Sequence, residues 1–236
     1  MRLLLVASLL IPIAACDNAP SSDYPTSETG IFVDVSVDGA RQAAATVGLT
    51  ADNPALLEVT YLRLEGGDRL SLTLGGADVP LAEQTLLGAY QYVGSLTGVA
   101  GRAAVAVAYE RADGVDALAT RGTLPAEFDL AATATRFSRA DGLQLIISGA
   151  GGAEELVVAV RSVEGCFEPF TERGPATASA VSIPAARFVL TPNGPATCNV
   201  DVTVRAVAHG TPDPAFGRGG QVTLSQVRTL ALTFDR

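Results

Sequence analysis

The feature that most constrains the fold is a period of two in hydrophobicity, repeated in short segments along the chain. Apolar residues occupy alternate positions in residues 31–37, in residues 70–74 and again in residues 200–206. Successive side chains of a strand point to opposite faces of its sheet, so this pattern predicts strands with one buried face. No segment after residue 16 shows a convincing helical period, and the fold class that we expect is therefore all-β.

Turn residues separate these segments at short intervals. Asp38-Gly39 follows the first alternating run, Gly66-Gly67-Asp68 lies between two more, and residues 149–153 form a glycine-rich loop. Hydrophobic residues make up 48% of the chain and charged residues 17%, which is enough apolar material for a packed core. Many short strands joined by such turns are typical of antiparallel β-sandwiches, and the length permits one or two of them.

The N-terminus has the pattern of an export signal. Arg2 precedes an apolar run at residues 3–13, which is too short to span a bilayer, since a helix needs about 20 apolar residues for that. The ending Ile13-Ala14-Ala15-Cys16 resembles the lipobox of bacterial lipoproteins. The resemblance implies cleavage before Cys16, lipid on its sulfur, and a membrane anchor that holds the protein in the cell envelope, facing the periplasm or the cell surface. An ordinary secretory peptide with Cys16 incidental is the alternative.

The chain divides into four parts on composition. Residues 17–30 are polar and rich in proline and serine, which predicts a flexible tether. Proline at position 125 interrupts the pattern and marks a boundary between two sets of strands. The predicted parts are a signal peptide at 1–15, a lipid-anchored flexible linker at 16–30, a first β-sandwich at 31–122 and a second at 124–236.

The second of these units resembles an immunoglobulin-like or fibronectin type III-like domain. The resemblance rests on its strand pattern, on the Ser182-Ile183-Pro184-Ala185 stretch and on the late long strand at residues 199–208. It implies a β-sandwich of seven or so strands. The chain departs from antibody-type domains because it contains no tryptophan and places its cysteines at strand ends.

Two cysteines remain after lipidation of Cys16. Cys166 and Cys198 form an even pair in an oxidising compartment, which predicts a disulfide bond between them. Two free thiols or a metal site are the alternatives, but no histidine or third cysteine lies nearby to complete a zinc shell. We expect no metal and no cofactor.

The charge balance excludes one class of partner. Sixteen Lys and Arg residues face 25 Asp and Glu residues, for a formal net charge of −9, and removal of residues 1–15 takes away only Arg2. Nucleic-acid binding depends on clustered positive charge, so we expect no nucleic-acid partner.

Several polar residues are candidates for catalysis or metal binding. His209 is the only histidine, and the chain has no Gly-x-Ser-x-Gly motif to hold a nucleophile. Asp34 to Gly39 matches the start of a calcium loop, but Ala45 stands where the loop needs a bidentate glutamate. Carboxylates in loops, at Glu154-Glu155 and Asp213, are interpreted as solvated charges rather than a glycosidase pair.

The sequence therefore predicts no catalytic residue. The function that we expect is that of a non-enzymatic structural or protein-interaction module, anchored to the membrane through Cys16 and bound to an envelope protein. The alternative is a carbohydrate-binding or glycan-processing accessory lipoprotein, suggested by Tyr90 and Tyr92, which stand two residues apart and are able to form an aromatic platform if both are exposed. Packing of the two rings in the core or on a sheet face is the preferred interpretation of this pair.

Overall fold

The alternating segments form strands whose apolar side chains are buried. The computed structural model describes residues 18–51 and 60–236, and in them the regular structure is β-strand apart from three short 3-10 turns. In β2 (Gly30–Val37), Ile31, Val33 and Val35 lie in the core while Phe32 and Asp34 face outward. The sheets are mainly antiparallel and pack in a sandwich-like arrangement, which confirms the predicted all-β fold class.

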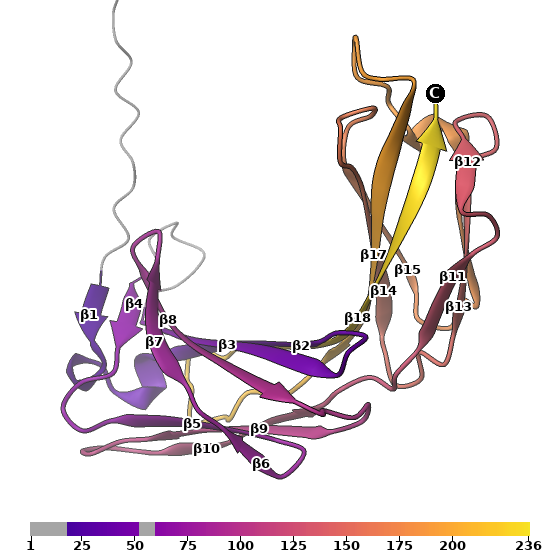
Figure 1. Cartoon of the computed structure of the whole chain (residues 1–236). Helices are drawn as coiled ribbons and strands as arrows, with labels where there is room; N and C mark the ends of the chain where they lie inside the picture. The colour runs from indigo at the N-terminus through magenta and orange to yellow at the C-terminus, as the bar shows by residue number, and fades with distance from the viewer. Residues whose placement is uncertain (1–17, 52–59) are drawn as a thin grey trace, which may run out of the picture.

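The first sandwich is made mostly by the N-terminal half of the chain (Figure 1). Its strands are β1 (Asn18–Pro20), β2, β3 (Gln42–Thr50), β4 (Tyr61–Arg63), β5 (Arg69–Leu74), β6 (Ala77–Val79), β7 (Ala82–Leu86), β8 (Ala89–Thr97), β9 (Ala104–Glu110) and β10 (Ala117–Thr123). One sheet has the order β1-β4-β3-β2, with β8 on the remaining part of β3 and β7 on β8. The facing sheet has the order β10-β9-β5-β6.

The second sandwich contains the remaining strands. They are β11 (Asp129–Ala132), β12 (Arg136–Ser138), β13 (Leu143–Ser148), β14 (Glu155–Ser162), β15 (Phe170–Pro175), β16 (Ala180–Ile183), β17 (Thr197–His209) and β18 (Gly220–Asp235). A small sheet of β11, β13 and β16 faces the sheet that contains β18, β17, β14 and β15. A cluster of phenylalanine rings fills the core between them, formed by Phe137, Phe167, Phe170, Phe188 and Phe234.

Strand β18 belongs to both sandwiches. Its first half, Gly220 to Gln226, pairs in parallel with β2, and its last residues pair in parallel with β12. From Thr223 to Asp235 it pairs antiparallel with β17. The β17–β18 hairpin therefore carries one sheet from the first sandwich into the second, and the two units form an L in Figure 1.

This shared hairpin differs from the division expected from the sequence, which placed all of residues 124–236 in the second unit. Val222 and Leu224, together with Phe216, belong to the core of the first sandwich, whereas Leu232 and Phe234 belong to that of the second. The alternation continues with the same parity through β18. A period of two reports which face of a strand is buried, and it does not report which sheet covers that face.

The segment predicted to be a flexible linker, 16–30, is ordered where the structure describes it, and that prediction was wrong from Asn18 onward. Residues 18–20 form β1 on the edge of β4, and two 3-10 turns follow, η1 (Ser21–Asp23) and η2 (Thr26–Glu28). Ser21, Thr26 and Thr29 are buried. Hydrogen bonds from buried hydroxyls hold much of the segment, together with the packing of Ala19 and Tyr24 against the first core, and so it shows no hydrophobic period in the sequence.

The described part of the chain contains no helix with the length and hydropathy of a transmembrane segment.

Candidate functional site

The outward face of the first sandwich is hollowed above strands β2, β3 and β18. The hollow has a volume of about 400 Å³, and Phe32, Asp34, Thr46, Tyr61, Gln91 and Gln221 are among the residues that line it. The strand register brings these side chains together, because Phe32 pairs with Gly48 on one side and Gln221 on the other. A Cβ atom on Gly48 would meet no atom within 4 Å, so the space above this glycine is open.

The chemistry of the hollow combines one exposed ring with polar groups. Phe32 is 41% exposed, which is unusual for a phenylalanine in a strand. Amide groups of Gln91 and Gln221 and the carboxylate of Asp34 surround it. A flat apolar surface beside convergent donors and acceptors suits a polar ligand that also has an apolar face.

Asp34 is held in place by the neighbouring strand. Arg205 of β17 donates from Nη2 to Asp34 Oδ2 at 3.3 Å and to Ser225 Oγ at 3.1 Å. Arg205 therefore contacts the carboxylate at the edge of the hollow that lies closest to the junction between the sandwiches. The elements that carry the hollow are long paired strands, which makes it a preformed site.

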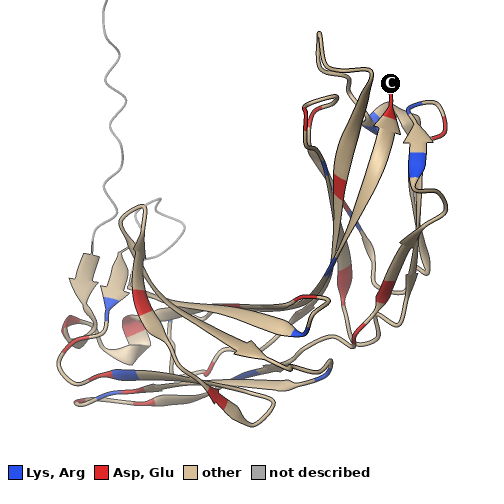
Figure 2. Ribbon diagram, in the orientation of Figure 1, with Lys and Arg blue, Asp and Glu red and all other residues tan. Residues whose placement is uncertain are grey.

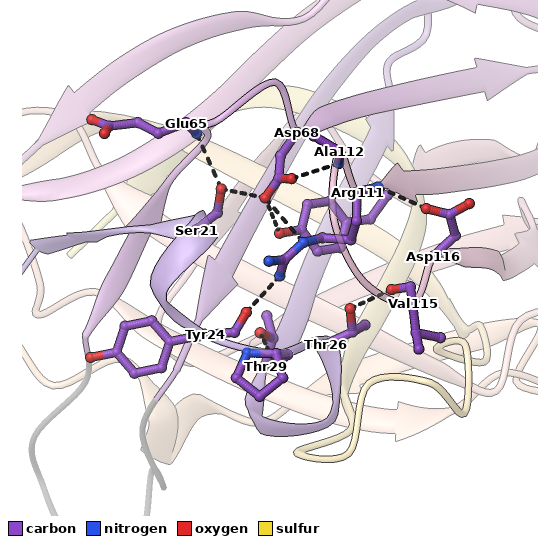
Figure 3. A network of polar contacts seen from close by, with 12 residues as sticks. Ser21, Tyr24, Thr26, Thr29, Glu65, Asp68, Arg111, Ala112, Val115 and Asp116 are labelled. Carbon is purple, nitrogen blue, oxygen red and sulfur yellow. Dashed lines mark hydrogen bonds and ion pairs between the residues drawn. The ribbon is translucent and has the colours of Figure 1, made fainter.

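A second polar cluster fastens the N-terminal segment to the first sandwich (Figure 3). Asp68 accepts hydrogen bonds from Ser21 Oγ at 2.7 Å, from Tyr109 OH at 2.9 Å and from the backbone N–H of Ala112 at 3.0 Å. The Nε atom of Arg111 lies 3.2 Å from Asp68 Oδ2, and both side chains are at most 5% exposed. Arg111 also donates to the carbonyl oxygen of Tyr24.

Burial and the hydrogen bond to Asp68 raise the pKa of Tyr109 to about 12, because both disfavour the phenolate. The hydroxyl therefore stays protonated and donates to Asp68 at neutral pH. All the groups of this cluster are used in contacts within the protein, and we assign it a structural role.

The predicted disulfide is present. Cys166, in the loop after β14, is bonded to Cys198 near the start of β17, with 6.3 Å between their Cα atoms. Both residues are buried in the second core, and Ser162 Oγ lies 3.2 Å from the sulfur of Cys198. The bond excludes the free thiols and the metal site that were the alternatives at these positions. The predicted lipidation site, Cys16, lies outside the described residues.

The other sequence candidates are separated in space or used in local structure. Asp38 accepts hydrogen bonds from two backbone N–H groups of its own turn. Glu154 accepts from the backbone N–H of His209, and Glu155 forms an ion pair with Arg173. The described residues contain no group of three or more histidine, cysteine or acidic side chains able to hold a metal ion.

Asp213, the remaining loop carboxylate, is not a solvated charge. It is buried, and its oxygens accept hydrogen bonds from the backbone N–H groups of Ala119 and Ala215. This part of the interpretation was wrong, because the loop before β18 folds back onto β10 and encloses the carboxylate.

Of the two interpretations of Tyr90 and Tyr92, packing within the protein is confirmed for Tyr92, and the aromatic platform does not form. Tyr92 is buried, and its hydroxyl oxygen accepts a hydrogen bond from the backbone N–H of Leu64 at 2.6 Å. The guanidinium of Arg63 lies over the ring of Tyr90. Phe32 is the exposed ring that sequence reasoning missed, although a phenylalanine at a polar position of an alternating strand is a signal in itself.

Comparisons with known proteins give little further information. No family model matches the chain, and no curated protein matches it. Among solved structures, similarity is found to a chain of a cytokine receptor complex, with 14% identity, a TM-score of 0.31 and coverage of 87% of this chain and 95% of that one.

Two further structures are similar at lower scores. The adhesin InvE of Yersinia pseudotuberculosis shows 13% identity and a TM-score of 0.24, with 89% of this chain and 60% of that one covered. The SGBP-B protein of a Bacteroides ovatus mixed-linkage glucan utilization locus, solved with a heptasaccharide, shows 9% identity and a TM-score of 0.20, with coverage of 88% and 61%. Similarities at these TM-scores carry no argument about function.

Proposed function

We propose that this chain is a bacterial envelope lipoprotein, anchored through lipid on Cys16, which acts without catalysis by presenting a binding face to another envelope protein. The observation that carries the proposal is the continuity of structure from the N-terminal segment to the C-terminus. β1 attaches residues 18–20 to the first sandwich, and β18 joins that sandwich to the second. An anchor that leads directly into a stiff scaffold holds a binding face in a fixed position relative to the membrane.

Two other features support this assignment. The disulfide between Cys166 and Cys198 is of the kind that persists in oxidising compartments outside the cytoplasm. The arginines are scattered over both sandwiches among a larger number of carboxylates (Figure 2), which disfavours nucleic acid and anionic surfaces as partners. The binding face that we assign is the hollow around Phe32.

The proposal is tested in intact cells. A photo-crosslinking amino acid at Gln221, on the rim of the hollow, is expected to capture one dominant envelope protein, and the N-terminal peptide is expected to carry acyl chains on Cys16. The same probe at Val163, an exposed residue beside the start of β17, serves as the control. Equal capture at the two positions would contradict the assigned face, and an unmodified Cys16 would contradict the anchor.

A second candidate function is the binding of a carbohydrate in the same hollow. The observation that favours it is the exposed ring of Phe32 between the amides of Gln91 and Gln221, since sugars offer both a face of C–H groups and a rim of hydroxyls. This site replaces the Tyr90 and Tyr92 platform as the place where a glycan would bind.

Substitution of Phe32 separates these two functions. If a glycan is the ligand, Phe32→Ala is expected to weaken its binding by on the order of tenfold, equivalent to about 1.4 kcal/mol. Titration calorimetry with peptidoglycan fragments and common envelope polysaccharides, using a chain that lacks residues 1–16, gives the measurement. Val163→Ala is the matched control. No binding to the wild-type chain by any of these glycans would remove this candidate.

A further inference from the structure

The turn between β7 and β8 exposes two leucines at a position where the backbone does not favour them. Leu86 is 52% exposed and Leu87 is 92% exposed, the highest value among the exposed large apolar residues of the described chain. Leu86 pairs with Ala89, so Leu87 and Gly88 form a two-residue turn, and both have positive φ, of 50° and 88°. Such turns favour asparagine, aspartate or glycine at the first position, and a bulky leucine there is strained.

Leu87 therefore does not serve the local fold. Its side chain is almost wholly in solvent, so it contributes little packing, and its backbone conformation is one that leucine rarely adopts. Residues 84–93 contain no charged side chain. The nearest charge in sequence, Glu83, is paired with Arg63 at 3.1 Å. The tip of the hairpin is thus uncharged and apolar.

The strand register places this tip at the end of the first sandwich where the N-terminal segment begins. β4 and β8 are both antiparallel to β3 and so run in the same direction. The hydroxyl of Tyr92 contacts Leu64, and the ring of Tyr90 lies beside Arg63. The turn precedes Tyr90 and therefore lies toward Tyr61, the start of β4, which pairs with Asn18 of β1.

Figure 1 agrees with this placement, since the β7–β8 turn rises at the end of the sandwich that carries β1 and β4. Cys16 is two residues before Asn18, so at most about 7 Å separates the Cα atom of the lipidated cysteine from that of the first residue of β1. A bilayer that holds the acyl chains must then lie against this end of the sandwich.

We infer that the Leu86-Leu87 turn inserts into the surface of the same bilayer and orients the first sandwich on it. This inference rests on the proposed anchor at Cys16. The partner is the boundary between lipid headgroups and acyl chains, which accepts apolar side chains and tolerates the uncharged tip. A second contact beside the lipid turns a single point of attachment into a fixed orientation.

The absence of tryptophan from the chain gives a direct test. Leu87→Trp introduces a single tryptophan at the tip, in the full chain expressed in bacteria, purified from their membranes and reconstituted into phosphatidylcholine vesicles. We expect its emission to shift to shorter wavelength and to be quenched by bromine atoms on the acyl chains. Val163→Trp, at the far end of the second sandwich, is the control and is expected to keep the emission of a solvated ring.

Flotation of the same vesicles separates failure of the anchor from failure of this inference. The full chain expressed in bacteria and purified from their membranes is used, and if it carries no acyl chains on Cys16 and does not float with the vesicles, the proposed lipidation is contradicted and this inference fails with it. A chain that floats while Leu87→Trp remains unquenched shows that the tip does not insert. An emission shift that depends on protein concentration and occurs without vesicles indicates contact between copies and also overturns the inference.

Leu87→Asn provides a second variant whose folding is not in question, because asparagine suits this turn. We expect its thermal midpoint to equal or exceed that of the wild type. Hydrogen exchange of the turn amides, residues 84–91, is expected to slow on anchoring of the wild type to vesicles but not on anchoring of this variant. Equal protection in both chains would contradict a role for Leu87 at the membrane.

Discussion

Replacing Asp68 with alanine is expected to destabilise the protein by about 3–5 kcal/mol. Asp68 is the centre of the buried cluster in Figure 3, where it accepts three hydrogen bonds and pairs with Arg111. The substitution leaves the charge of Arg111 buried without its partner, and it leaves the hydroxyl of Tyr109 without its acceptor. Removal of one member of a buried pair costs more than the pair contributes, because the remaining charge is unsolvated.

Chemical denaturation measures this loss, and hydrogen exchange shows where it occurs. We expect faster exchange in residues 20–29 first, since Ser21 and Tyr24 are attached through this cluster. Arg161→Ala breaks an exposed ion pair with Asp201 and serves as the control, expected to leave stability nearly unchanged. The double variant Asp68→Ala, Arg111→Ala is expected to lose less than the sum of the single losses. A loss below about 1 kcal/mol for Asp68→Ala would contradict the structural role.

Replacing both Cys166 and Cys198 with alanine is expected to cost roughly 3–4 kcal/mol, on the chain-entropy model of a crosslink with a sequence separation of 32 residues. The bond joins the loop after β14 to the start of β17, and it lies in the core of the second sandwich. Without the bond, the unfolded chain gains conformational entropy, while the contacts of the phenylalanine cluster in the folded state remain. The free energy of unfolding therefore falls.

The measurement compares unfolding in denaturant with and without reductant. The wild type in reductant is expected to approach the stability of the double alanine variant in either condition, while the variant itself is insensitive to reductant. Strand β18 is shared, so loss of the disulfide in the second sandwich also affects the first. We expect the unfolding transition of the whole protein to become less cooperative. A reduced wild type as stable as the oxidised protein would contradict the expected contribution of the bond.

Local pattern was sufficient to predict the class of fold. Alternation in residues 31–37 and 200–206 reports a buried face, and the structure has strands with that face inward at both places. The pairing of Cys166 with Cys198 was predicted because two cysteines remain after Cys16 and the expected compartment is oxidising. Strand alternation depends on neighbouring residues, and the disulfide depends on the number of cysteines. Both can therefore be predicted without knowledge of the fold.

The prediction failed where polar contacts between distant residues decide the structure. Residues 18–30 look like a linker because their stabilising groups are serine and threonine hydroxyls, whose partners are up to 89 positions away. For Tyr90 and Tyr92, spacing shows only that two rings share a face, and the preferred interpretation, packing within the protein, is confirmed for Tyr92, which is buried and bonded to Leu64. Burial is a property of packing, which spacing alone does not specify.

The sequence by itself determined that the chain forms β-sheets, that its two internal cysteines pair, and that its arginines are outnumbered by carboxylates. Only the tertiary structure decided that one strand, β18, is shared by two cores and that Phe32 lies in a hollow. It also decided that the Leu87 turn lies at the same end of the sandwich as Asn18. The physical reason is that side-chain periodicity is set within a strand, whereas the partner of each strand is chosen by the pairing and packing of the whole chain.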